Sequence, residues 1–210
     1  MTSHEVSPPD PIDPWEDRPV VANLGGAGFV PLIGAFRRLQ DAFSGACPPE
    51  PELSQLTARV KSLADDLARW EAPERHTPAG TRPDLPGRGS PLLPPFVVEE
   101  WTADRMRARV TFSRFHLGGN GAAHGGTLTL LFDDVLGRLQ NHGERRVART
   151  AYLTVNFRKI TRVGIEHVVE ADLERIEGRK RFVTGRLVDP DGALVADAEG
   201  LFVELRPGQP

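Results

Sequence analysis

A glycine-rich segment followed by a helix-forming run holds the densest group of potentially reactive residues in this sequence. It reads LGGNGAAHGGTLTLLFDD, from Leu117 to Asp134. A dinucleotide-binding fingerprint needs a third glycine where His124 stands, and the Gly-Lys-Ser/Thr of a P-loop is absent. The pair Gly125 and Gly126 instead precedes apolar residues at helical spacing, so it is predicted to begin a helix.

The first turn of a helix can act on a negatively charged oxygen. Its backbone N–H groups have no partners within the helix, and the helix dipole favours negative charge there. Because Gly125 and Gly126 have no side chains, a substrate could approach these N–H groups closely, and they could then stabilise an oxyanion. The alternative is structural, with both glycines only permitting a tight turn from a strand into the helix.

Two adjacent carboxylates follow in the same helix. Asp133 lies seven residues after Gly126, so two helical turns place both on nearly the same face, away from the apolar stripe. Asp133 could therefore face a substrate or a second subunit, or it could be an ordinary solvated carboxylate. Asp134 points roughly a third of a turn away and competes with Asp133 for any catalytic role.

Other site chemistries are not indicated. The histidines lack metal-ligand spacing, and neither an HExxH nor a GxSxG motif is present. The single cysteine, Cys47, can form neither an intramolecular disulfide nor a cysteine zinc site. We therefore expect no metal and no cofactor, and a reducing compartment.

Charge and hydropathy limit the partners and the location. The 210 residues carry a formal net charge of -3, with a sequence pI near 6.1, so no nucleic-acid partner is expected. Glycines and a proline interrupt the uncharged stretch from Val20 to Phe36, which argues against stable membrane insertion. No secretory signal is visible at the N-terminus, so a cytoplasmic location is expected.

Proline divides the chain into four expected regions. Of the 19 prolines, 16 lie in residues 1–95 and none lies between 96 and 189, so the sheet should belong to the C-terminal half. The expected regions are a mobile proline-rich arm (1–19), an N-terminal helical extension (20–72), a semi-extended Pro/Gly-rich linker (73–95) and a C-terminal domain (96–205).

Two amphipathic helices are predicted in the extension. The first covers residues 31–45, with Pro31 at its start and an apolar face. The second carries apolar residues at spacings of three and four from Leu53 to Trp70. These helices must pack on each other, on the C-terminal domain or on a second subunit, and the second could also form a short coiled coil, although core packing is the more common use of such a stripe.

The C-terminal region alternates with a period of two and is interrupted by one helix. Inward-facing residues are predicted on three strands: Met106, Ala108, Val110 and Phe112; Ala151, Leu153, Val155 and Phe157; and Val169, Ala171 and Leu173. A further strand is expected over 194–205, with turns at Glu177-Gly178 and Asp191-Gly192. The helix, over 126–140, places Leu128, Leu131, Phe132, Val135, Leu136 and Leu139 on one face. This order predicts an α+β fold with one long helix packed on an antiparallel sheet.

The motif His124-Gly125-Gly126, six residues and then Asp133 resembles the PaaI-like branch of the hotdog-fold acyl-CoA thioesterases. The segment RTAYLTVNFRKI, residues 149–160, resembles the strand that follows the central helix in that branch. The resemblance spans about residues 96–205 and does not extend to the residues before 96. It implies a hotdog fold, an antiparallel sheet wrapped around one long helix, and the hydrolysis of an acyl-CoA thioester.

The resemblance also implies roles for individual residues. Gly125, alone or together with Gly126, would supply the backbone N–H that polarises the thioester carbonyl. Asp133 would be the catalytic carboxylate, as general base or as nucleophile, and Thr150 would position the water or the carboxylate. His124 would shape the turn and contact the thioester.

Members of this branch build each active site between two subunits, so a homodimer or a dimer of dimers is implied. Several of them carry an asparagine six residues before the motif's histidine, a position held here by Gly118. Asn120 is the nearest amide that could replace it. Two basic clusters could bind the phosphates of coenzyme A, and the first consists of Arg158, Lys159 and Arg162. Residues 179–181 form the second, and either cluster could equally be a solvated strand end.

Three other functions fit parts of the pattern. An acyl-CoA-binding sensor would keep the fold without the chemistry, and it would need neither Asp133 nor Thr150. A hotdog hydratase would normally use a histidine with an acidic partner in other motifs, which are absent here. A scaffold would make the N-terminal helices the functional part of the protein.

Overall fold

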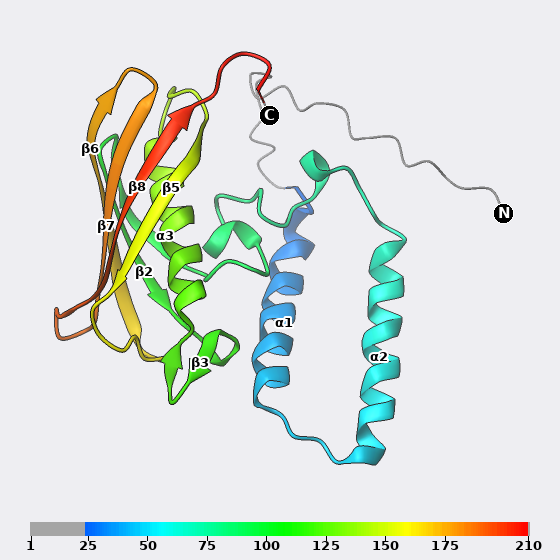
Figure 1. The fold of residues 1–210 in the computed structure, drawn as a ribbon. Coiled ribbons are helices and arrows are strands. Elements are labelled where there is room, and N and C mark those ends of the chain that lie inside the picture. Colours follow the sequence, from blue (N-terminus) through cyan, green and yellow to red (C-terminus); the bar gives the residue numbers. More distant parts are fainter. Residues whose placement is uncertain (1–23, 210) are drawn as a thin grey trace.

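The computed structural model describes residues 24–209, and the arm expected over residues 1–19 lies outside them. A six-stranded antiparallel sheet curls around one long helix, α3 (Gly125–Gln140), and two further helices stand beside this unit (Figure 1). The strands of the sheet lie in the order β1 (Val97–Trp101), β2 (Arg105–Thr111), β6 (Glu166–Glu177), β7 (Lys180–Val188), β8 (Leu194–Glu204) and β5 (Ala148–Phe157).

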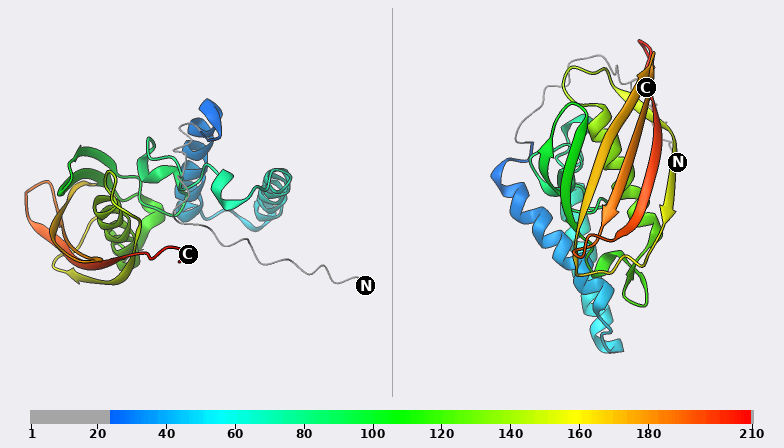
Figure 2. Two further views of the ribbon diagram at one scale, coloured as in Figure 1. Left: turned by 90° about the horizontal axis from the view of Figure 1, so that it is seen from above. Right: turned by 90° about the vertical axis from the view of Figure 1, so that its left-hand side faces the viewer.

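This arrangement is the hotdog fold that the resemblance implies. Seen from above, the sheet curves around α3 like a sleeve, while the N-terminal helices lie outside it (Figure 2). The predicted turns at Gly178 and Gly192 join β6 to β7 and β7 to β8, and both glycines adopt the positive φ that such turns require. A short hairpin of β3 (Leu117–Gly119) and β4 (Ala122–Ala123) leads into α3.

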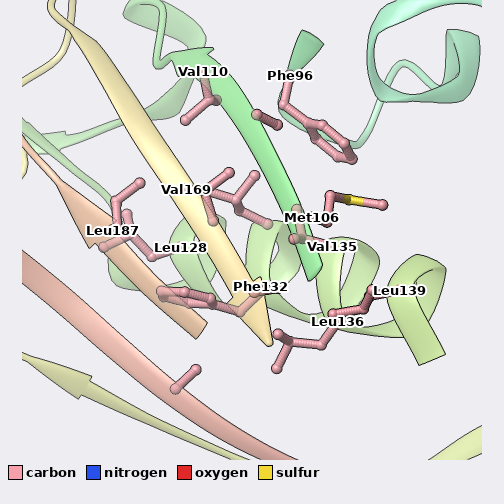
Figure 3. Close-up of a cluster of buried hydrophobic side chains, with 14 of the residues drawn as sticks. Phe96, Met106, Val110, Leu128, Phe132, Val135, Leu136, Leu139, Val169 and Leu187 are labelled. Atoms are coloured by element: carbon pink, nitrogen blue, oxygen red, sulfur yellow. The ribbon is translucent and has the colours of Figure 1, made fainter. Parts of the chain in front are cut away.

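The core lies between α3 and the concave face of the sheet, as predicted. All six apolar residues expected on the helix are at most 2% exposed, and so are the four expected on β2 and its extension. Figure 3 shows this cluster, with Phe132 and Leu136 reaching the central strands. A Cβ atom built on Gly185 of β7 would lie 2.9 Å from the Phe132 ring. Glycine at this position therefore allows α3 to pack closely against β7.

Strand β5 departs from the predicted alternation. Leu153 and Val155 pack against the core, but Ala151 and Phe157 are exposed. The pairing of β5 with β8 shifts register between Thr150 and Tyr152, which is typical of a β-bulge. Because a bulge inserts an extra residue, the side chains before and after it no longer follow one alternation.

The N-terminal helices differ from the prediction in their bounds and in their packing. Helix α1 (Gly26–Gly45) begins before Pro31, which lies inside it, and α2 covers Glu50–Ala68. The N-cap is Gly25, at a φ of 75°, so α1 starts five residues before the predicted start at Pro31. Helix α2 has no buried residue, so its predicted use in a core is wrong for the single chain.

The segment 73–95 is folded rather than semi-extended. It contains two short 3-10 helices, η1 (Glu74–His76) and η2 (Pro86–Gly89), and it packs between α1 and the sheet. Arg37 of α1 donates hydrogen bonds to the carbonyls of Pro86 and Ser90, at 2.8 and 3.2 Å. Proline removes backbone donors, but here side chains of α1 satisfy the carbonyls that remain, so the segment folds against them.

Within residues 24–209, no helix is long and apolar enough to cross a membrane. The same residues contain no cluster of histidine, cysteine or acidic side chains arranged to hold a metal ion.

Candidate active site

The N-terminus of α3 presents one backbone donor at the surface. His124 is the N-cap, and its Nδ1 accepts a hydrogen bond from the Gly126 N–H at 3.0 Å. The Gly125 N–H makes no hydrogen bond within the described part of the chain, since it stands at the first helical position. Of the two glycines, Gly125 therefore offers the available N–H, and Gly126 is already capped.

The surroundings of Gly125 limit what can approach it. A Cβ atom at Gly125 would lie 3.2 Å from the Phe157 ring, so this aromatic side chain of β5 borders the helix start closely. Because Nδ1 of His124 accepts a hydrogen bond, the neutral ring carries its proton on Nε2. The exposed His124 ring can thus donate a hydrogen bond to a group bound beside the turn.

Asp133 of α3 and Thr150 of the edge strand β5 contact each other directly. The Thr150 hydroxyl donates to Oδ1 of Asp133 at 2.8 Å, and both residues are exposed. Thr150 pairs with Phe202 and Leu153 pairs with Gly200, so Thr150 and Leu153 lie on the helix side of the sheet. Uninterrupted alternation predicts the opposite face for Thr150, and the bulge turns its side chain toward α3.

Asp134 occupies a different environment from Asp133. Its side chain is 6% exposed, and Oδ1 lies 2.6 Å from Nη2 of Arg88, in the segment that joins α2 to the sheet. Burial raises the pKa of the Asp134 carboxyl above its ordinary value, while Arg88 and Arg138 oppose this rise. Asp134 is therefore a buried, paired carboxylate, and Asp133 is the one that a solvent-borne substrate can reach.

Asn120 lies at the tip of the hairpin that precedes the helix. It is exposed, and its backbone has a φ of 49°, a left-handed conformation that asparagine tolerates better than most residues. The hairpin is fixed by hydrogen bonds from Ala123 to the Thr161 carbonyl and from Val163 to the Gly121 carbonyl. The turn by itself accounts for asparagine at this position.

The two basic clusters have different surroundings. Arg158 forms an ion pair with Asp197 of β8 at 2.5 Å, which lowers the pKa of the Asp197 carboxyl, while Lys159 is exposed. In the second cluster, Arg181 is 4% exposed and donates to the carbonyls of Gln140 and Arg146. Arg181 is therefore a structural arginine and not a surface contact for a phosphate.

The single chain does not enclose the candidate residues in a cavity. Two hollows on the described surface, of about 210 and 150 Å³, lie beside β1 and are lined in part by Val97. Neither of them includes Gly125, Asp133 or Thr150. In one copy of the chain, Asp133 and Thr150 are exposed and Gly125 is half-buried.

Sequence reasoning missed Arg88 and Phe157 as neighbours of the site. Arg88 stands between two glycines in a proline-rich stretch, where nothing in the local pattern marks a buried contact. Phe157 was expected in the core, as the last inward residue of its strand. Phe157 keeps the face of Leu153 and Val155, and its exposed position beside Gly125 follows from its place at the end of the edge strand β5.

Comparison with known proteins finds similarity to thioesterases. Residues 120–196 match the family described as Thioesterase superfamily. The acyl-coenzyme A thioesterase THEM4 of Mus musculus is 34% identical over 97 residues, and that of Bos taurus is 31% identical over 91 residues. These matches cover 45% and 43% of this chain and 41% and 37% of the relatives, so the chain spans about two fifths of their length.

Solved structures extend the likeness to the N-terminal region. A thioesterase superfamily protein of known crystal structure is 27% identical, with a TM-score of 0.71, and the match covers 87% of this chain and 93% of that one. Because residues 96–205 make up only about half of the chain, this match includes much of the region before residue 96. The PaaI protein of E. coli, 17% identical with a TM-score of 0.50, shares the fold over 53% of this chain and 80% of its own.

Proposed function

We propose that this chain, whose residues 120–196 belong to the thioesterase superfamily, hydrolyses an acyl-CoA thioester to a free acid and coenzyme A. The observation that carries the proposal is the 2.8 Å hydrogen bond from the Thr150 hydroxyl to the exposed Asp133 carboxylate. A protein that only binds acyl-CoA needs neither group, whereas hydrolysis needs a base and a positioned water.

The chemistry assigns one role to each group. Thr150 holds Oδ1 of Asp133 and can accept a hydrogen bond from a water through its own oxygen. Asp133 takes a proton from that water while the water oxygen attacks the thioester carbon. The resulting oxyanion accepts a hydrogen bond from the Gly125 N–H. Collapse of this intermediate breaks the C–S bond, and the departing thiolate takes the proton back from Asp133.

A second route uses the same residues. Asp133 itself attacks the thioester carbon, the thiolate leaves, and water hydrolyses the acyl-aspartate anhydride. Label found in the Asp133 side chain after a single turnover in ¹⁸O-labelled water would establish the anhydride route. The anhydride route places label in the Asp133 side chain when water attacks its carbonyl, and the general-base route places label only in the product acid.

The spacing along α3 favours a site made by two copies of the chain. Asp133 lies eight residues after Gly125, about 12 Å along the helix axis at 1.5 Å per residue. One thioester carbon cannot lie within a few ångströms of both. The helix start of one copy and Asp133 of another would therefore form each site, in a homodimer or a dimer of dimers.

The remaining parts of the proposal concern binding and location. Acyl-CoA is the proposed ligand because the matching relatives are named as acyl-coenzyme A thioesterases. His124, Gly126 and Asn120 would border the thioester, and exposed Lys159, beside Arg158, would meet a phosphate of coenzyme A. The lone cysteine of the chain, the exposed Cys47, supports a reducing cytoplasmic location.

A coenzyme A release assay over a series of acyl chain lengths tests the proposal. We expect thiol release from at least one chain length by the wild-type protein and almost none by Asp133→Asn. Thermal stabilisation by acyl-CoA without any thiol release would instead identify an acyl-CoA-binding sensor and overturn the proposed hydrolysis.

A further inference from the structure

Helices α1 and α2 form an antiparallel hairpin whose apolar faces are left uncovered in one copy of the chain (Figure 1). On α2, five apolar residues are each 39–52% exposed: Leu53, Leu56, Val60, Leu63 and Leu67. On α1, Leu32, Phe36, Leu39 and Phe43 are 38–83% exposed. Contiguous apolar surface of this kind marks an interaction site in a water-exposed protein.

The contacts of α1 lie on another face of that helix. Arg37 and Gln40 donate to backbone carbonyls in the segment 86–91, and Asp41 accepts the Phe115 N–H. Within residues 24–209, no element, α1 included, packs extensively against α2. The hairpin is thus attached to the rest of the chain through these polar contacts and the buried Ile33 of α1, while both apolar stripes remain available.

The spacing of the stripes identifies the kind of packing. On α2, the apolar residues recur at steps of three and four without interruption, and Trp70, 83% exposed, continues the series. On α1, the steps are four, three and four. A strict series of this type is the narrow seam of a coiled coil or helical bundle, whereas a globular core usually needs a broader face.

The charges beside the seam of α2 identify the occupant. If α2 pairs with an antiparallel α2 of a second copy, so that Val60 packs opposite Leu63, then Leu67 meets Leu56 and Leu53 meets Trp70. In this register residue 64 of the second copy lies opposite Arg59, and Asp66 flanks the seam on the same side two residues away, at the position where charged side chains pair across a coiled coil. Within one copy, Asp66 also forms an exposed ion pair with Arg69 at 2.9 Å. The two-fold axis repeats the pair, so each apolar layer and the Arg59–Asp66 pair have their complements on the identical helix.

We propose that the α1–α2 hairpin is a self-association surface that pairs with the hairpin of a second copy of this chain, with α2 antiparallel to α2. The stripes of both α1 helices complete the core of the resulting four-helix bundle. This interface is separate from the candidate active site, and the inference does not depend on the proposed hydrolysis.

Two glutamate substitutions on opposite faces of α2 test the surface. Val60 lies on the seam, and Ala58 lies on the opposite side of α2. Both positions are exposed in one copy, so either variant should retain the wild-type circular dichroism. By size-exclusion chromatography with light scattering, we expect Val60→Glu to halve the mass of the wild-type assembly and Ala58→Glu to leave it unchanged.

A charge exchange tests the identity and the register of the partner. Arg59→Asp and Asp66→Arg should each shift the full-length protein toward the smaller assembly, and the double variant should return the larger one. Only a second copy of the same helix can be restored in this way. A Val60→Glu protein of unchanged mass would overturn the proposal. If the Val60→Glu protein kept its mass but had a changed KM for long-chain acyl-CoA, the apolar stripe of α2 would be assigned to binding the acyl chain.

Discussion

The Arg88 guanidinium lies 2.6 Å from the carboxylate of Asp134, the residue next to the candidate base Asp133. Arg88 belongs to a turn in which Gly87, Arg88 and Gly89 all have φ between 56° and 67°, and Arg37 of α1 holds this turn through two carbonyls. The N-terminal extension is thereby joined to the middle of α3. One role of the region before residue 96 is to brace the helix where Asp133 lies.

Asp133→Asn should retain the fold and lose at least about two orders of magnitude in turnover, the usual scale for removing general-base catalysis. The side chain is exposed, so its replacement leaves no buried group unpaired. Asp134→Asn is the matched control and should lower the melting temperature much more than it lowers turnover per folded molecule. The reverse pattern would show that Asp134 is the reactive carboxylate.

Thr150→Val should lower turnover roughly tenfold or more with little change in KM, because one positioning hydrogen bond is worth about 1–2 kcal/mol. Valine is nearly isosteric and keeps the β-branched shape that suits a strand. Thr154→Val, exposed on the same strand, controls for a change of hydroxyl to methyl at this edge. Equal turnover in wild type and Thr150→Val would leave Thr150 a purely structural residue.

Gly125→Pro should lower turnover by roughly 10²–10³, the usual effect of removing one oxyanion donor. Proline deletes the N–H but suits the first position of a helix, and His124 has the extended backbone that precedes proline well. Gly125→Ala adds a similar contact with Phe157 while keeping the N–H, so it separates donor loss from crowding.

Mixing two inactive variants tests whether each site is shared between copies. After subunit exchange, half of the dimers in an equal mixture of Gly125→Pro and Asp133→Asn are hybrids, and one of the two sites in each hybrid is intact. We expect about a quarter of wild-type activity to return, as two-fold symmetry requires. Recovery of no activity from a mixture proven to exchange would place both groups of one site in the same chain.

Arg88→Gln should destabilise the protein more at neutral pH than near pH 4. Burial raises the pKa of Asp134 in the folded chain, so its contribution to stability is greatest below the unfolded pKa and declines as pH rises through the folded pKa. At neutral pH, Asp134 needs the charge of Arg88, and its loss should cost about 1–3 kcal/mol, less than for a fully buried pair because Arg88 is 39% exposed. Chemical denaturation at the two pH values measures the difference, and a pH-independent loss would contradict this account.

The hotdog core was predictable because it rests on local periodicity. The apolar residues of α3 recur at helical spacing, and those of β2 and β6 alternate, so each set faces one side before any tertiary contact is considered. Asp133 was predictable as the exposed carboxylate for the same reason, since it points away from the apolar stripe of its own helix.

The surroundings of the site depended on long-range contacts. The bulge in β5 arises from its pairing with β8, and it turns Thr150 to the helix side, where uninterrupted alternation had placed it on the opposite face. The apolar stripes of α1 and α2 predicted buried faces, but their spacing did not identify the element or subunit that covers them.

What the sequence determined by itself is therefore the main elements of the C-terminal domain, the buried face of α3 and the candidates Gly125 and Asp133, because these follow from spacing and residue type along one strand or helix. Thr150 was indicated only by the resemblance to the thioesterase family. What only the tertiary structure decided is which partner the neighbouring buried carboxylate, Asp134, has. That partner is Arg88, which lies 46 residues before Asp134 in the chain and reaches it only when the segment 73–95 folds between α1 and α3. Pairing and burial act through space, and local sequence does not encode the distance between such residues.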